Sequence, residues 1–229
     1  MSLLISKTSA SFLIRTSLHS LLQKSLTTSL TYLSQPVYAP LVSHALRTNL
    51  QLIDHLHPAA SPSRFDALST LMLNGPIKIW IFAPEKIVFA TLAVEVVISI
   101  TNRMGVGVLR FFADVLQPLL RTLGTVSIGQ VGKLLLLTAR AVRLLCQVGR
   151  PVLKRWRGLV LSNVAKCWLA RDDVELRQEL KAIVQELKVD SDLMEVSCLQ
   201  SDLPELMLCQ GYIKKLKDLG DLELNMLFD

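Results

Sequence analysis

The sequence predicts an all-α protein, with membrane-associated amphipathic and apolar helices and a small water-facing helical C-terminal region. Its 229 residues are 51% hydrophobic but only 6% aromatic, which favours helices built on Leu, Val, Ile and Ala over strands. Between Asp114 and Asp172, 57 residues include ten Lys or Arg and no acidic residue. Several of these cations recur at helical spacing on an otherwise apolar background, which is typical of helices at an anionic bilayer.

The net charge of +6 is divided unevenly along the chain. Residues 1–170 contain 18 basic and 5 acidic residues, whereas residues 171–229 contain 7 basic and 14 acidic residues. This asymmetry predicts that the first part lies near anions and that the second part faces water. The composition argues against nucleic acid as the anion, because nucleic-acid-binding surfaces are richer in Lys, Arg, Gly and aromatic residues and poorer in Leu.

Residues 1–35 are predicted to be a targeting or amphipathic N-terminal segment. The first 53 residues are rich in Ser, Thr and Leu and contain no acidic residue. Their basic residues are Lys7, Arg15, Lys24 and Arg47. This composition is typical of a mitochondrial transit peptide. The alternatives are a chloroplast address and an uncleaved amphipathic helix that lies on a membrane.

Residues 36–76 are predicted to be a helix followed by a linker region. A helix is expected over residues 41–55, and the Pro- and Ser-rich residues 58–63 read as the linker. We expect Ser63 to cap a second, short helix, which residues 74–76 (Asn-Gly-Pro) would end.

Residues 77–171 are predicted to be a membrane-associated helical region that begins with a candidate membrane span. Pro84 and Glu85 fit the first turn of its helix, and residues 87–101 are apolar except for Glu95. Fifteen helical residues reach only ~22 Å, less than a ~30 Å hydrocarbon core, so we expect a short or kinked span or a re-entrant hairpin. Glu95 would then be an intramembrane polar residue that needs a partner. The alternative is the core helix of a soluble bundle, with Glu95 at its rim.

The next expected helix covers residues 106–123 and has a single line of polar residues. These residues are Arg110, Asp114, Gln117 and Arg121. Arg110 and Asp114 are further candidate intramembrane polar residues, spaced to pair with each other. Pro118 is expected to kink this helix.

Two amphipathic helices are expected on either side of residues 149–151, with Trp156 and Trp168 flanking the second. Their cations are the candidate lipid-binding residues, which would hold lipid phosphates: Lys133, Arg140, Arg143, Arg150, Lys154, Arg155 and Arg157. The predicted partner of this surface is therefore an anionic membrane lipid.

Residues 172–229 are predicted to be an acidic helical C-terminal region. Asp172 and Glu175 are a plausible capping pair, and an apolar stripe follows them: Val174, Leu176, Leu180, Ile183, Val184 and Leu187. A further helix is expected to open near Pro204 and to end at Gly220.

Residues 212–221 (Tyr-Ile-Lys-Lys-Leu-Lys-Asp-Leu-Gly-Asp) resemble the Bcl homology three helix of pro-apoptotic proteins. In that helix an apolar anchor, Leu and another apolar residue precede Gly-Asp. The resemblance implies that Tyr212, Leu216, Leu219 and Asp221 bind a partner's groove. It covers ten residues and departs at Glu223, where the family has a final apolar anchor. An ordinary amphipathic helix is the alternative.

No nucleophile elbow, kinase signature, phosphate-binding loop or dinucleotide fingerprint is found in the sequence. The four cysteines form no CxxC pair and are predicted to be buried reduced thiols: Cys146, Cys167, Cys198 and Cys209. His55 and His57 lack a third ligand nearby and read as loop residues. We therefore expect no enzymatic activity, no metal and no cofactor.

The predicted function is a non-catalytic structural, assembly or organising protein of a mitochondrial membrane, which binds acidic lipid and protein partners, with a larger membrane complex as one possibility. Three alternatives stay open. They are a membrane-shaping protein of the endoplasmic reticulum or lipid droplets, an apoptosis regulator that acts through residues 212–221, and a soluble helical bundle.

Overall fold

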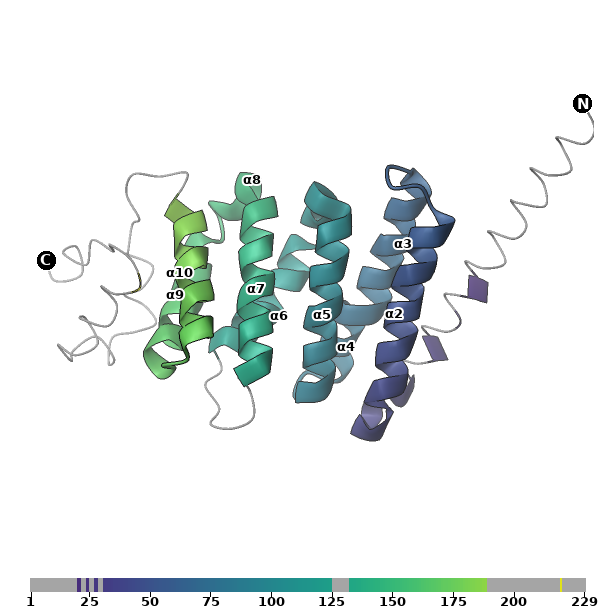
Figure 1. Ribbon diagram of the computed structural model, residues 1–229, viewed down its shortest axis with the longest axis horizontal. Coiled ribbons are helices and arrows are strands. Elements are labelled where there is room, and N and C mark those ends of the chain that lie inside the picture. Colours follow the sequence, from purple (N-terminus) through teal and green to yellow (C-terminus); the bar gives the residue numbers. More distant parts are fainter. Residues whose placement is uncertain are drawn as a thin grey trace, which may run out of the picture. The chain divides into compact units, whose positions relative to one another are not determined.

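A computed structural model describes residues 31–124 and 132–188, together with Ser20, Leu21, Lys24, Thr27, Thr28 and Leu219. Every element in this part of the chain is a helix (Figure 1), which confirms the all-α prediction for the described residues. The chain divides into two compact units, residues 1–104 (unit 1) and residues 105–229 (unit 2). The boundary between them lies after Met104, and the four regions expected from the composition stay a prediction.

Unit 1 is built around two helices that run in the same direction. Its described elements are η1 (Thr31–Ser34), η2 (Pro36–Tyr38), α2 (Ala39–Leu56), α3 (Pro62–Met72), the π-helical turn η3 (Leu73–Ile77), α4 (Lys78–Phe82) and α5 (Ile87–Met104). Helix α5 packs against α2, α3 and α4 (Figure 1). Arg47 on α2 contacts Glu95 on α5, and Asp54, further along α2, contacts Arg103, further along α5. Because the contacts advance in the same direction on both helices, α2 and α5 are parallel.

The α2 prediction is confirmed, but the predicted boundaries around α3 are wrong. Ser61, not Ser63, caps α3: its Oγ accepts a hydrogen bond from the Arg64 backbone N at 3.2 Å. Residues 74–76 do not stop the helix, because the π-helical turn carries the chain through Pro76 into α4. The chain packs closely against α2 at this turn, since a Cβ on Gly75 would lie 2.9 Å from Leu46 Cδ2.

Helix α5 begins at Ile87, after a turn that contains Pro84 and Glu85, so these two residues do not form its first turn. It ends before Gly105, which has a φ of 51° in the left-handed region that favours glycine. One face of α5 supplies the core of unit 1, and Phe89, Ala93, Val97 and Ile100 are fully buried there.

Among the described residues, one helical run, Ile87–Gly124, is long and apolar enough to be a candidate membrane span. Of its most apolar window, 44% is buried inside the protein. A core helix of a soluble protein meets the same criteria, so this run gives only weak support to membrane association.

Unit 2 contains a second pair of parallel helices. Its described elements are η4 (Gly105–Phe111), α6 (Phe112–Gly124), α7 (Gly132–Val148), α8 (Arg150–Leu153), α9 (Arg157–Ala170) and α10 (Val174–Lys188). Helix α6 packs against α7 and α9, while α10 packs mainly against α7 (Figure 1). The expected polar line of α6 is exposed, and its opposite face is buried.

The apolar stripe predicted for residues 174–187 is buried from Leu176 onward, whereas Val174 is 69% exposed. Asp173, not Asp172, caps this helix: its Oδ1 accepts a hydrogen bond from the Leu176 backbone N at 2.8 Å. Asp172 instead pairs with Arg177. An N-cap carboxylate accepts from the backbone N–H three residues further on, and Asp173 makes this contact while Asp172 is bound by Arg177.

Candidate protein-binding site

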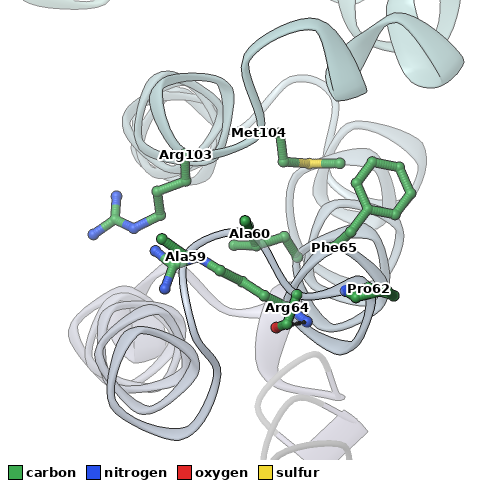
Figure 2. A pocket seen from close by; sticks show the side chains of 9 residues that line it. Ala59, Ala60, Pro62, Arg64, Phe65, Arg103 and Met104 are labelled. Carbon is green, nitrogen blue, oxygen red and sulfur yellow. Dashed lines mark hydrogen bonds between the residues drawn. The ribbon is translucent and has the colours of Figure 1, made fainter.

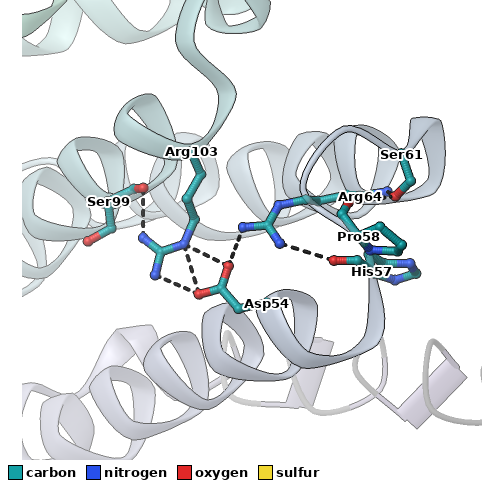
Figure 3. Close-up of polar contacts among 7 residues, drawn as sticks. All are labelled: Asp54, His57, Pro58, Ser61, Arg64, Ser99 and Arg103. Atoms are coloured by element: carbon teal, nitrogen blue, oxygen red, sulfur yellow. Dashed lines mark hydrogen bonds and ion pairs between the residues drawn. The ribbon is translucent and has the colours of Figure 1, made fainter.

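One end of unit 1 is held by a polar cluster, here called the Asp54 cluster, which consists of Asp54, Arg64 and Arg103. Asp54 lies near the end of α2, Arg64 in the first turn of α3 and Arg103 near the end of α5 (Figure 3). The Asp54 carboxylate accepts from Arg64 Nη2 at 2.5 Å and from Arg103 Nη2 at 2.8 Å. Arg103 Nε also donates to both carboxylate oxygens, at 3.0 and 3.1 Å. One carboxylate therefore ties three helices together.

The surroundings of Asp54 favour its charged form. The hydrogen bond from Arg103 lowers the pKa of Asp54 most, and the charges of Arg103 and Arg64 lower it further, against the raising effect of burial. The Arg64 side chain is only 14% exposed. Removal of the carboxylate would therefore leave a largely desolvated guanidinium without its main counter-charge.

The same cluster fixes the loop between α2 and α3 (Figure 3). Arg64 Nη1 donates to the carbonyl oxygen of His57 at 3.1 Å, and Ser61 Oγ donates to that of Pro58 at 2.9 Å. This arrangement assigns a structural role to the His57 backbone, at the C-cap of α2.

A pocket of about 270 Å³ lies next to this loop and is lined mainly by small or apolar groups (Figure 2). Its lining residues are Ala59, Ala60, Ser61, Pro62, Arg64, Phe65, Leu68, Arg103 and Met104. The charged groups of Arg64 and Arg103 are bound to Asp54, and Ser61 Oγ is the cap of α3. The polar side chains of this pocket thus serve to hold the fold, and they form no arrangement of nucleophile and base.

The opposite end of unit 1 exposes large apolar side chains. This apolar end consists of Val37, Tyr38, Leu41, Ile81, Phe82, Ile87 and Val88, which are 37–73% exposed. Because α2 and α5 are parallel, their N-terminal ends lie on the same side of unit 1 (Figure 1). Lys86 Nζ connects the two segments by donating to the carbonyl oxygens of Leu33, at 3.0 Å, and Ser34.

At this end of unit 1, exposed aromatic side chains lie close in sequence to buried ones. Phe82 is 70% exposed at the end of α4, whereas Phe89, in the first turn of α5, is fully buried. The rings of Tyr32 and Tyr38 lie 4.7 Å apart and brace the start of α2. The apolar end is therefore a set of exposed side chains on an ordered framework.

The intramembrane role predicted for Glu95 stays a prediction, but the residue has a partner within unit 1. Glu95 Oε2 lies 3.1 Å from Arg47 Nη2 on α2, and the Glu95 side chain is 29% exposed. The alternative, a core helix of a soluble bundle with Glu95 at its rim, also stays a prediction. Arg110 and Asp114 are both exposed on unit 2, and the Arg110 guanidinium lies 5.1 Å from the centre of the Phe111 ring.

Several of the predicted lipid-binding cations pair with α10. Arg140 Nε and Arg143 Nη1 each lie 3.2 Å from the carboxylate of Glu179, and Arg150 Nη2 lies 3.1 Å from that of Glu186. Gln147 Nε2 also donates to Glu186 at 2.8 Å. We call this set the α7–α10 ladder. Lipid binding by the basic stripe stays a prediction.

The contacts of the ladder repeat along α7 and α10, a feature that the sequence analysis did not predict. The contact made by Arg140 and Arg143 recurs seven residues later with Gln147 and Arg150, and the partner advances from Glu179 to Glu186. A shared seven-residue spacing is typical of packed parallel helices. In the sequence, Glu179 and Glu186 have the same seven-residue spacing as Arg143 and Arg150. This equal spacing is the signal that could have predicted the contact.

The pKa of Glu186 is lowered, first by the hydrogen bond from Gln147 and then by Arg150, against the raising effect of burial. The two described cysteines are free and buried, as predicted. Burial raises the pKa of the Cys146 thiol to about 12 and that of the Cys167 thiol to about 11. Both are therefore protonated, poorly reactive thiols at neutral pH.

The C-terminal partner-binding prediction falls mostly outside the described residues. Tyr212, Leu216 and Asp221 lie there, as do Cys198, Cys209 and the helix expected near Pro204. Leu219 is described and is 2% exposed. Most of the predicted targeting segment, residues 1–35, also lies outside the described residues.

Comparison with known protein families identifies one match. The model of the Tti2 family matches residues 1–128, which include all of unit 1 together with η4 and α6. No curated protein and no solved structure matches the chain. Because the matched residues make up more than half of the 229, the chain belongs to the Tti2 family.

Proposed function

We propose that this protein is a non-catalytic adaptor that binds the apolar face of a partner protein's helix through the apolar end of unit 1. Its work would be to hold that partner in a larger protein complex during or after assembly. The single observation that carries the proposal is the exposed apolar end within the residues that match the family.

Family membership supports the general class of function. The Tti2 family is an assembly- or chaperone-like family of non-enzymatic, adaptor-type proteins, and membership implies protein partners in a complex. Since unit 1 lies entirely within the matched residues, a surface of unit 1 is the first place to look for a partner site.

The physical properties of the apolar end suit a helical partner. Scattered single hydrophobic residues are normal on protein surfaces, whereas adjacent ones mark interaction sites. Phe82 and Tyr38 offer exposed aromatic side chains, which often dominate binding energy, and Leu41 and Val88 offer exposed aliphatic side chains at the same end. An amphipathic helix places apolar residues on one face and binds such surfaces without strand pairing.

The Asp54 cluster supports this function from the other end of unit 1. By fixing α2, α3 and α5 together, the cluster holds the N-terminal ends of α2 and α5 in place before a partner arrives. Preorganisation of this kind lowers the entropic cost of binding.

A membrane function in mitochondria, as predicted from the sequence, is the second candidate. The observation that favours it is the apolar run Ile87–Gly124, which has the length and composition of a candidate span. Lipid would then cover exposed side chains that the first proposal assigns to a protein partner. The experiment below separates the two.

The test is site-specific photocrosslinking in cells that express the full-length chain. A benzophenone amino acid is placed at Phe82, which is 70% exposed, and as a matched control at Val174, which is 69% exposed in unit 2. We expect crosslinks to one or a few defined proteins from position 82 and not from position 174. Crosslinks to lipid, or the same protein products from both positions, would contradict the proposal.

A double substitution supplies the second arm of the test. Phe82→Ser with Val88→Ser should abolish recovery of the crosslinked partner, while thermal unfolding of the purified variant stays close to that of the parent, because both side chains are already exposed. Partner recovery at the parent level would overturn the assignment of this surface.

A further inference from the structure

Unit 2 contains a groove that the proposed function does not use. It has a volume of about 580 Å³ and lies between the start of α6 and the segment that includes α8. Its lining residues are Leu109, Arg110, Phe112, Ala113, Pro151, Val152, Lys154, Arg155 and Trp156. This volume is within the ~300–1,000 Å³ of typical ligand sites.

The floor of the groove is apolar and partly aromatic. The ring centres of Phe112 and Trp156 are 6.3 Å apart, with the planes tilted by 59°. Phe112 is held close to the turn before α8, since a Cβ on Gly149 would lie 2.4 Å from its ring. Pro151 and Val152 are exposed at the edge of this floor.

The charged residues of the groove all have the same sign. Arg110, Lys154 and Arg155 are exposed, and the nine lining residues include no carboxylate. The Arg155 guanidinium lies 5.9 Å from the centre of the Trp156 ring, which places a cation over the aromatic floor. Arg140, Arg143 and Arg150 lie outside this groove, where they pair with carboxylates of α10.

We propose that this groove binds a short acidic segment of a partner protein that carries one large apolar side chain. The apolar side chain would contact Phe112 and Trp156, and the flanking carboxylates would pair with Lys154 and Arg155, with the positive charge of Arg110 nearby. Arg and Lys clusters recognise acidic motifs in this manner. The proposal reassigns Lys154 and Arg155 from lipid phosphate to peptide carboxylate, and it does not depend on the apolar end of unit 1.

The shape of the site favours a peptide over a bilayer. A bilayer presents a broad anionic plane, which suits cations spread along an exposed helix face. Here the cations come from two segments that are 44 positions apart in the chain, Arg110 on η4 and Lys154 after α8, and they border a concave apolar floor. A single side chain flanked by carboxylates matches that arrangement.

The test measures binding of a fluorescein-labelled peptide, Glu-Glu-Asp-Phe-Glu-Glu-Asp, to the full-length chain by fluorescence anisotropy. We expect saturable binding that weakens with added salt, because exposed charge pairs are screened. A peptide with Ser in place of Phe should bind about tenfold more weakly, since it lacks the apolar contact.

Matched charge reversals locate the site. The double variant K154E/R155E should weaken binding about tenfold or more, whereas R121E/K133E, which changes the net charge equally outside the groove, should have a much smaller effect. Unchanged circular dichroism and thermal unfolding would show that both variants keep their fold.

Three outcomes would overturn the proposal. The first is absence of saturable peptide binding, and the second is equal loss of binding in the two double variants, which would indicate bulk charge alone. The third is that the protein binds vesicles of phosphatidylcholine and cardiolipin through Lys154 and Arg155, and that added peptide does not displace it from the vesicles. That result would return these cations to a lipid surface.

Discussion

Each unit contains a pair of parallel helices joined by arginine–carboxylate contacts, but the two pairs are joined differently. In unit 1, α2 and α5 meet at Asp54, where one carboxylate binds Arg103 and also Arg64 of α3. In unit 2, α7 and α10 meet at Glu179 and again at Glu186, one heptad later. Unit 1 thus adds to the Arg47–Glu95 pair one carboxylate shared by three helices, whereas each carboxylate of the α7–α10 ladder joins only two.

The exposure of the arginines sharpens this difference, although the Asp54 carboxylate, at 31%, is more exposed than those of Glu179 and Glu186, at 17% and 16%. Arg64 is 14% exposed in the Asp54 cluster, whereas the three ladder arginines are 41–50% exposed. Water and salt screen the ladder more strongly than the cluster. Loss of one carboxylate should therefore be costly in unit 1 and modest in unit 2.

The largest expected effect is that of Asp54→Asn. This change removes the counter-charge of two arginines, one of them mostly buried, and should lower the free energy of unfolding of unit 1 by about 2 kcal/mol. Hydrogen exchange of α2, α3 and α5, read by mass spectrometry, measures this locally. The control is Asp66→Asn, at an exposed position on α3 outside the cluster, which should change little.

The effect of Asp54 should also depend on pH. Because its pKa is lowered in the folded protein, its stabilising contribution is present above the ordinary aspartate pKa of about 3.9 and is lost as the pH falls through the folded pKa. The difference between the parent and Asp54→Asn should therefore be full at neutral pH and should vanish in acid. A difference that persists in acid would show that the cluster acts through shape and not through charge.

An intermediate effect is expected for the cap that supports the cluster. Ser61→Ala should cost about 1 kcal/mol, because the Arg64 amide loses its acceptor at the start of α3. Ser63→Ala, two residues later on an exposed position, should cost less. Denaturant unfolding of the two variants compares them directly, and an equal cost would contradict the structural assignment of the cap.

The smallest effect is expected for the ladder. Glu179→Gln and Glu186→Gln should each destabilise the α7–α10 contact by roughly 0.5–1 kcal/mol at low salt. The two effects should nearly add, because the repeats share no hydrogen bond and only the charge of Arg143 acts on both carboxylates. Since the pKa of Glu186 is lowered, its contribution is also lost as the pH falls below the ordinary glutamate value of about 4.3. Hydrogen exchange of α10 at low and high salt is the measurement. A loss that is unchanged at high salt would contradict the screened character of the ladder.

The sequence predicted well those features that depend on neighbours along the chain. Helices were expected over residues 41–55 and 106–123, and the structure has helices at Ala39–Leu56 and, as η4 with α6, at Gly105–Gly124. The apolar stripe of α10 was identified from spacing alone, and five of its six members are buried. These features follow from helical periodicity, which is a local property.

The errors lie where several nearby residues competed for one role. Ser61 and Ser63 are both suitable caps, as are Asp172 and Asp173, and the path of the preceding loop decides between them. Residues 74–76 carry a strong stop signal, but Gly75 lets the chain pack against Leu46 and continue as a π-helical turn. At Gly75, packing against a distant segment overrode the local preference.

By itself, the sequence determined the helical class, the positions of the main helices and their apolar faces, because these depend on composition and periodicity. The tertiary structure alone decided which charges pair and which apolar residues stay exposed. Arg143 finds Glu179 across 36 residues and Arg103 finds Asp54 across 49, while Phe82 is exposed and Phe89 is buried. Such outcomes depend on which helices run parallel and in what register, and residues far apart in the chain meet only after those helices have packed.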